Sequence, residues 1–169
     1  MKMYLLRHGE AVDRTDPQFK IDADRPLTEP GIKRTQALAQ ALRQMEISFD
    51  LIFSSPLVRA RETAKIIQRG LRGPEPIEWT SHLAPTGDME RLVAQVNGVR
   101  PVPKSILLVG HEPDLSRLIA LLCTGGPNLA LTMKKGGLCR LDVAKLRCGR
   151  CASLEWLLPP RVQGMGAGK

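Results

Sequence analysis

Short apolar runs alternate with stretches of helical periodicity over the first 123 residues of the chain. Each run is bounded by turn-forming residues and predicts a buried strand; the runs lie at residues 3–6, 50–56, 77–79 and 105–110. Between them, apolar side chains recur every three or four positions, which predicts helices over residues 28–45, 57–67 and 113–122 and a further helix that begins at residues 86–88 and ends near residues 97–98. This alternation predicts a mainly parallel sheet that is covered by helices on both faces.

The last part of the chain has a different pattern. Residues 136–143 and 152–157 alternate apolar and polar side chains around a turn, which predicts a hairpin that adds antiparallel or edge strands to the sheet. The predicted fold class is therefore α/β, a three-layer α/β/α sandwich with a mainly parallel central sheet. A chain of 169 residues fits one such domain, which we expect over residues 1–160, followed by a loose C-terminal tail over residues 161–169.

Composition narrows the classes of partner. The chain has 25 Lys and Arg against 17 Asp and Glu, a net charge of +8 that favours phosphate, nucleic acid, acidic proteins or anionic lipid. Aromatic residues make up only 4%, so the stacking surfaces typical of single-strand nucleic-acid binding are largely missing and no nucleic-acid partner is predicted. No run approaches the roughly 18 apolar residues of a membrane span, and no signal peptide is evident. We therefore expect no membrane association and a cytoplasmic location, and we make no prediction of the oligomeric state.

Four cysteines lie in the second half of the chain: Cys123, Cys139, Cys148 and Cys151. The last two form a Cys-x-x-Cys pair, but a structural zinc site needs a second pair or a histidine partner at ligand spacing. Only Cys139 lies nearby. Because strand-like runs flank the pair, the pattern favours a hairpin turn with reduced thiols.

Three of the predicted strands end in residues that are suited to chemistry. Arg7 and His8 directly follow the first strand, Arg59 lies one turn into the helix after the second, and His111 follows the strand at residues 105–110. Ligands of α/β proteins bind at the carboxyl edge of the sheet, so we expect these four side chains to converge there.

Two histidines with two arginines admit three interpretations: a metal site, an anion-binding site without chemistry, and a site of phosphoryl transfer. The two guanidinium charges would repel a cation, so no metal is predicted. Arginine matches phosphate oxygens in a bidentate manner, and a neutral imidazole can attack phosphorus. A second, protonated histidine would add charge and a hydrogen-bond donor. The set therefore favours phosphoryl transfer through a histidine nucleophile.

These residues lie in motifs that resemble those of the histidine phosphatase superfamily, which has the phosphoglycerate-mutase-like fold. The motifs are Leu6-Arg7-His8-Gly9-Glu10, Ser54-Ser55-Pro56-Leu57 with Arg59-Ala60-x-Glu62-Thr63-Ala64, and Val109-Gly110-His111. The short chain, Pro26-Leu27-Thr28-x-x-Gly31 and Gly110-His111-Glu112-Pro113 further resemble the small SixA-type phosphohistidine phosphatases. The resemblance implies that His8 becomes phosphorylated, that Arg7, Arg59 and His111 bind the phosphoryl oxygens, and that no metal or organic cofactor takes part.

One departure from the family pattern concerns the general acid. Many members carry a glutamate shortly after the third strand, whereas this chain has Leu83-Ala84-Pro85-Thr86-Gly87-Asp88 there. Asp88 and Glu112 are two candidates for the acid. Asp88 can instead cap the next helix, and Glu112 can instead favour a helix N-terminus. A phosphohistidine substrate needs no such acid, because its imidazole can leave after protonation on its own nitrogen.

Three hypotheses follow. The first is a phosphatase that removes phosphate from phosphohistidine on a protein, such as a histidine-containing phosphotransfer domain, and it agrees with the short loops and the missing glutamate. The second is a phosphatase or mutase of the same superfamily that acts on a small phosphate ester and depends on Asp88 or Glu112. The third, suggested by the charge of +8, is a phosphate- or nucleic-acid-binding module without catalysis.

Overall fold

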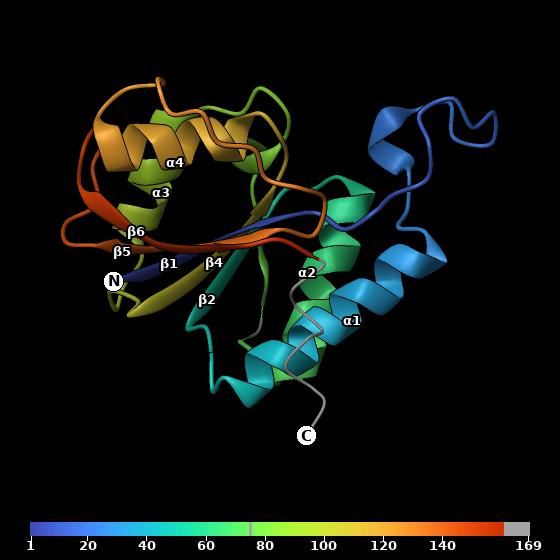
Figure 1. Cartoon of the computed structure of the whole chain (residues 1–169), viewed down its shortest axis with the longest axis horizontal. Helices are drawn as coiled ribbons and strands as arrows, with labels where there is room; N and C mark the ends of the chain where they lie inside the picture. Colours follow the sequence, from blue (N-terminus) through green and yellow to red (C-terminus); the bar gives the residue numbers. More distant parts are fainter. Residues whose placement is uncertain (75, 161–169) are drawn as a thin grey trace.

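The computed structural model describes residues 1–74 and 76–160 of the chain. Its centre is a six-stranded sheet with the order β3-β2-β4-β1-β5-β6 (Figure 1). The strands are β1 (Lys2–Arg7), β2 (Leu51–Ser54), β3 (Glu78–Trp79), β4 (Ser105–Gly110), β5 (Leu138–Val143) and β6 (Ala152–Leu158). The first four pair in parallel, while β5 and β6 form an antiparallel hairpin beside β1. The predicted mainly parallel sheet with an antiparallel hairpin is confirmed.

Helices cover both faces of this sheet, which confirms the three-layer α/β/α sandwich (Figure 1). On one face lie α1 (Glu29–Gln44) and α2 (Val58–Leu71), and on the other lie α3 (Met89–Gly98) and α4 (Asp114–Thr124). Two short 3-10 helices, η1 (Asp22–Asp24) and η2 (Ser81–Leu83), lie in connections. Among the described residues, no helix is long and apolar enough to cross a membrane.

The core follows from the alternation of side chains along each strand. In β1, Met3 and Leu5 pack with α3 and α4, whereas Tyr4 and Leu6 pack with α1 and α2. These four side chains are 0–3% exposed, so β1 is buried on both faces. Because β1 is packed on both faces, the residues that directly follow it have a fixed position at the edge of the sheet.

Local backbone geometry sets the helix boundaries. The hydroxyl of Thr28 accepts a hydrogen bond from the N–H of Gly31 and caps α1, as its sequence position predicts. The sequence allows α3 to begin anywhere from Thr86 to Asp88; the structure has Asp88 as the N-cap, whereas Thr86 has a φ of 62° and lies outside the helix. The helix α2 continues past Ile67, the last apolar position of its pattern, and ends at Leu71, with Arg72 as its C-cap at a φ of 52°. The predicted C-terminal tail, residues 161–169, lies outside the described residues.

Candidate active site

Backbone hydrogen bonds from two neighbouring strands hold the segment that carries Arg7 and His8. The N–H of His8 donates to the carbonyl of Gly110 at the end of β4 (3.1 Å), and the N–H of Arg7 donates to the carbonyl of Gly137 before β5 (3.1 Å). Gly136 donates its own N–H to the carbonyl of His8 (3.0 Å). The residues after β1 are therefore fixed from both sides of the strand.

The imidazole of His8 is arranged as a nucleophile. Its Nδ1 lies 2.7 Å from the carbonyl oxygen of Gly9. A carbonyl can only accept, so Nδ1 carries the proton and Nε2 carries the lone pair. The pKa of His8 is lowered to about 3, mainly by burial and also by the charges of Arg59 and Arg7, against the opposing effect of the Gly9 hydrogen bond. The ring is therefore neutral at pH 7 and presents Nε2 for attack.

His111 lies directly beside His8, with 4.9 Å between the two ring centroids. Its Nε2 is 2.8 Å from the hydroxyl oxygen of Ser55, which follows β2. The pKa of His111 is lowered to about 3, mainly by burial and also by the charges of His8 and Arg59. The sequence led us to expect a protonated ring, whereas with these neighbours it is neutral. A phosphate dianion beside it would raise the pKa again, because a nearby negative charge favours the protonated form.

Arg59 reaches the same place from the first turn of α2. Its side chain is 1% exposed, which is unusual for arginine and requires partners. It donates from Nη1 to the backbone carbonyl of Asp22 (2.7 Å) and from Nη2 to the Asp22 carboxylate (2.9 Å). The loop at residues 11–26 thus orients this guanidinium.

Arg7 is oriented by a different segment. Its Nη1 donates to the carbonyl of Met133 (2.7 Å), and the N–H of Met133 donates to Oε1 of Glu112 (3.0 Å). The hydroxyl of Ser116 donates to the same oxygen (2.6 Å). Among the described residues, the Nε atoms of Arg7 and Arg59 are buried and have no hydrogen-bond partner. Two buried charged donors without acceptors are suited to an anion such as phosphate.

The two candidate acids have partners that account for their positions. The carboxylate of Asp88 caps α3 by accepting from the N–H of Arg91 (3.0 Å), and its side chain is 49% exposed. Glu112 accepts from Met133 and Ser116, as described above, and its charge raises the pKa of Arg7 against the larger lowering effect of burial. A role of either residue as a general acid stays a prediction.

Three residues that sequence reasoning did not single out complete the arrangement. Asp22 binds Arg59, Ser55 binds His111, and Thr63 on α2 accepts a hydrogen bond from the N–H of Gly9 (3.0 Å). Ser55 and Thr63 belong to the quoted motifs, so the motifs carried a signal for them. Asp22 is one of several aspartates in a polar loop, and nothing in the sequence distinguishes it from the others.

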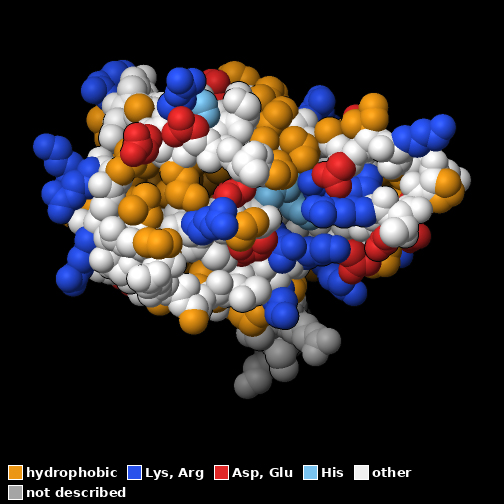
Figure 2. All heavy atoms as spheres, turned by 90° about the horizontal axis from the view of Figure 1, so that it is seen from above, with side chains coloured by type: hydrophobic (Ala, Val, Ile, Leu, Met, Phe, Trp, Pro, Cys, Tyr) orange, Lys and Arg blue, Asp and Glu red, His pale blue; other side chains and the backbone are white. Residues whose placement is uncertain are grey.

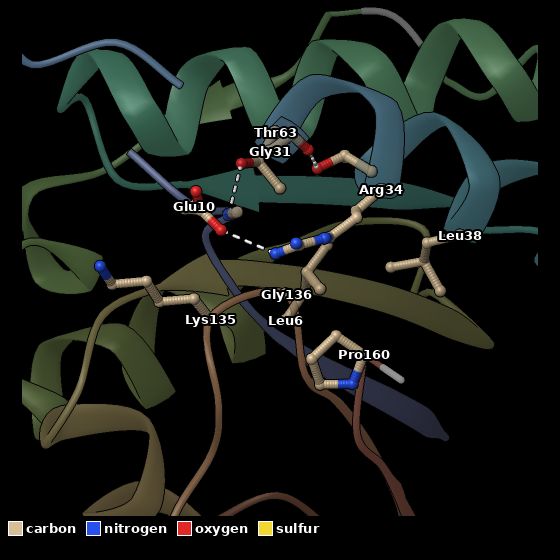
Figure 3. Close-up of a pocket in the computed structure, with 11 residues that line it drawn as sticks. Leu6, Glu10, Gly31, Arg34, Leu38, Thr63, Lys135, Gly136 and Pro160 are labelled. Carbon is tan, nitrogen blue, oxygen red and sulfur yellow. Dashed lines mark hydrogen bonds and ion pairs between the residues drawn. The ribbon is translucent and has the colours of Figure 1, made fainter. Parts of the chain in front are cut away.

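A small crevice of about 10 Å³ lies beside the loop that follows His8, lined partly by Gly9 and Glu10 (Figure 3). Glu10 forms an ion pair with Arg34 of α1 there (2.7 Å). Because Gly31 has no side chain, α1 can approach the loop after His8 closely; a side chain at that position would collide with the Glu10 carbonyl. His8, Arg59 and His111 do not line the crevice, so it supports the nucleophile loop and is separate from the histidine pair.

The surface around the site is basic. Figure 2 shows histidine side chains at one face of the molecule, with Lys and Arg side chains gathered beside them. Lys135 is exposed and its charge acts on His8, and the side chain of Arg14 is 77% exposed and acts on Arg59. Basic side chains of this kind attract anionic substrates over a distance.

The cysteine pair lies away from these residues. Cys148 and Cys151 lie between β5 and β6, in the hairpin connection that the sequence predicted, and their thiols are free. The thiol of Cys151 donates to the carbonyl of Arg147 (3.4 Å). Within residues 1–74 and 76–160, no three His, Cys, Asp or Glu side chains are grouped as metal ligands would be.

Comparisons with known proteins agree with this fold and arrangement. Residues 3–95 match the family model of the histidine phosphatase superfamily, branch 1. An uncharacterised protein of Picosynechococcus is 36% identical over 168 residues, covering 94% of this chain and 100% of that protein. The phosphohistidine phosphatase SixA of Escherichia coli is 28% identical over 127 residues, covering 74% of this chain and 76% of that protein. A solved structure of the protein histidine phosphatase SixA complexed with tungstate has the same fold, with a TM-score of 0.83 at 23% identity, over 95% of this chain and 98% of the other.

The α/β/α sandwich and the histidine pair at the carboxyl edge of its parallel strands can therefore be assigned to a known family. The chain belongs to the histidine phosphatase superfamily and is a phosphatase enzyme of that family. The family resemblance read from the motifs is confirmed.

Proposed function

We propose that this phosphatase removes phosphate from phosphohistidine on a protein, such as a histidine-containing phosphotransfer domain, through a phosphorylated His8. The observation that carries the proposal is the state of His8: a neutral ring with its Nδ1 proton held by Gly9 and its Nε2 lone pair available. His111 and two arginines lie beside it as partners for phosphoryl oxygens.

The reaction proceeds in two displacements. In the first, Nε2 of His8 attacks phosphorus, the nitrogen–phosphorus bond of the substrate breaks, and the substrate imidazole leaves with a proton on its other nitrogen. In the second, water attacks the phosphorus on His8, which releases phosphate and restores the imidazole. Arg7, Arg59 and His111 stabilise the charge on the phosphoryl oxygens in both steps, as positioning and electrostatics dominate phosphoryl transfer.

Two features favour a phosphoramidate on a protein over a phosphate ester. The carboxylates of Asp88 and Glu112 are engaged in hydrogen bonds to backbone and side-chain donors, whereas an alkoxide leaving group needs a proton from an acid. The exposed basic side chains beside the site suit an acidic protein surface. The name of the Escherichia coli relative, phosphohistidine phosphatase, agrees with this substrate class.

The test uses the purified protein with a phosphorylated phosphotransfer domain and with a panel of phosphate monoesters. We expect the phosphoprotein to be hydrolysed with the highest kcat/KM, and an acid-labile phosphate to be trapped on the enzyme. The variant His8→Ala should lose both turnover and the trapped phosphate, whereas His82→Ala serves as a matched control because His82 lies outside the histidine pair.

Two results would overturn the proposal. Much faster turnover of one small ester would support the small-ester hypothesis instead, especially with loss of that activity in Asp88→Ala or Glu112→Ala. Failure to trap phosphate on His8 with any substrate would support a binding module without catalysis.

A further inference from the structure

The carboxylate of Asp22 contacts Arg59, one of the residues to which we assign the phosphoryl oxygens. Its Oδ2 accepts from Nη2 of Arg59 (2.9 Å), while its Oδ1 accepts from Nε and Nη2 of Arg25 (3.0 and 2.7 Å). It is also close enough to His111 for its charge to raise the pKa of that ring. Of the carboxylates in the described residues, Asp22 is the one that contacts Arg59 directly and acts on His111.

This carboxylate is negatively charged and remains accessible. Burial acts to raise the pKa of Asp22, but the hydrogen bond from Arg25 and the charges of Arg59 and Arg25 outweigh it and hold the pKa below its usual value. The side chain is 46% exposed, so a substrate can approach it from solvent. A charged carboxylate of this kind cannot give a proton to an alkoxide, but it can accept a hydrogen bond from a cation or an N–H group.

The leaving group of a phosphohistidine presents such a donor. Its imidazole is bonded to phosphorus through one nitrogen and must carry a proton on the other nitrogen to leave as neutral imidazole. In the reacting form the ring is therefore cationic, and an adjacent carboxylate favours that form and accepts its N–H. An aryl or alkyl phosphate has no equivalent donor on its leaving group.

We infer that Asp22 is a specificity-determining residue, whose carboxylate accepts the N–H of the leaving imidazole and selects phosphoramidates over phosphate esters. The inference rests on the proposed function, since it concerns the substrate of the same site. In the structure the same carboxylate pairs with Arg59, Arg25 and Arg14, and its exposed side is left for the N–H of the leaving group.

A different role for Asp22 makes a different prediction. If Asp22 only positioned Arg59, its loss would weaken the binding of every phosphoryl group and would slow ester and phosphoramidate hydrolysis equally. The ratio of the two rates therefore separates selection of the leaving group from positioning of the arginine. Because both rates are measured on the same preparation, the ratio does not depend on how much of the variant is folded.

The experiment measures kcat/KM of the full chain for phosphoimidazole, for a phosphorylated phosphotransfer domain and for an aryl phosphate. In Asp22→Asn, which keeps the shape but not the charge, we expect the ratio of phosphoimidazole to aryl phosphate to fall by at least about 10-fold, as for loss of a hydrogen bond to a charged group. Asp22→Glu should keep the ratio within about 3-fold, because the charge remains. The control is Asp24→Asn, an exposed aspartate in the same 3-10 helix.

The outcomes separate this inference from the proposed function. Equal losses for both substrate types in Asp22→Asn would overturn the inference alone. Selective loss with phosphoimidazole, in a parent enzyme that ignores the phosphoprotein, would support the inference and overturn the protein substrate. A parent enzyme that hydrolyses only the aryl phosphate would overturn both.

Discussion

The backbone N–H of Gly9 donates a hydrogen bond of 3.0 Å to the hydroxyl of Thr63, and this hydroxyl donates in turn to the carbonyl of Arg59 at 2.7 Å. One side chain thus joins the loop after the nucleophile to the helix that carries Arg59. All of these atoms lie in buried surroundings, so the distance between His8 and Arg59 depends on this connection.

We predict that Thr63→Val lowers both stability and activity. Valine fills the same volume but leaves the Gly9 N–H buried without an acceptor, which costs about 1–3 kcal/mol of unfolding free energy. We expect kcat to fall by about 10-fold, measured with an aryl phosphate, because the loop that holds His8 moves relative to Arg59. Thr63→Ser keeps the hydroxyl and should restore most of the activity. Full activity in the valine variant would contradict the prediction.

A second prediction concerns Ser55, which orients His111 through the hydrogen bond of 2.8 Å. Removal of the hydroxyl in Ser55→Ala leaves Nε2 of His111 without its partner, so we expect kcat/KM to fall by about 10-fold. Ser54→Ala is the matched control, because Ser54 is equally buried but its hydroxyl donates to a backbone carbonyl. If Ser55→Ala and Ser54→Ala lowered kcat/KM equally, the loss would come from a disturbed end of β2 and not from the missing hydrogen bond to His111.

Glu112 provides a test of positioning against acid catalysis. As a positioning residue it holds Met133, whose carbonyl holds Arg7, so Glu112→Ala, which removes the acceptor, should raise KM by several-fold and leave kcat nearly unchanged. As a general acid it would lower kcat instead, and most strongly for esters with poor leaving groups. Steady-state kinetics with a series of aryl phosphates of graded leaving-group pKa distinguishes the two roles.

For Asp88 we predict an effect on stability without an effect on chemistry. Asp88→Ala removes the cap of α3, so the thermal midpoint should fall by a few degrees. Asparagine also caps helices well, so Asp88→Asn should lower the thermal midpoint less than Asp88→Ala does. Hydrolysis rates below the melting range should match those of the parent, and a selective loss of ester hydrolysis would instead identify Asp88 as the acid.

The histidine pair predicts how stability changes with pH. Both rings have a pKa of about 3 in the folded chain against 6.5 in the unfolded chain, so between these values the unfolded state binds more protons. Stability is therefore complete above pH 6.5 and is lost as the pH falls, by up to about 1.4 kcal/mol per pH unit for each ring. Urea unfolding at pH 7, 6 and 5 measures the slope, and His111→Asn should reduce it by about half. A urea midpoint that does not change over this range would contradict the assigned burial of the pair.

Sequence reasoning could predict the parts of the fold that depend on local pattern. The strand ends at His8 and His111 and the cap at Thr28 follow from apolar runs and capping chemistry, and the structure has them where expected. The exact first residue of α3 is different, because the pattern leaves Thr86 to Asp88 open and the residue type of Thr86 does not favour the left-handed backbone that excludes it. Local pattern alone therefore fails where the backbone adopts a rare conformation.

The site could be predicted only as a set of residues, without their partners. Parallel strands that share an edge bring His8, Arg59 and His111 together, which the order of elements implies. The contact between Asp22 and Arg59 depends on the path of a polar loop, for which the sequence carries no periodic signal. The neutral state of His111 depends on the degree of burial, which is a property of the assembled core.

The position of β1 has a consequence for the order in which the protein matures. The nucleophile directly follows β1, yet this strand lies between β4 and β5, and its backbone is held by Gly110 and Gly137, which come much later in the chain. A nascent chain that ends before Gly137 lacks one side of this support, and one that ends before Gly110 also lacks His111. The site is therefore complete only after synthesis has passed Gly137 and β1 has paired with β4 and β5.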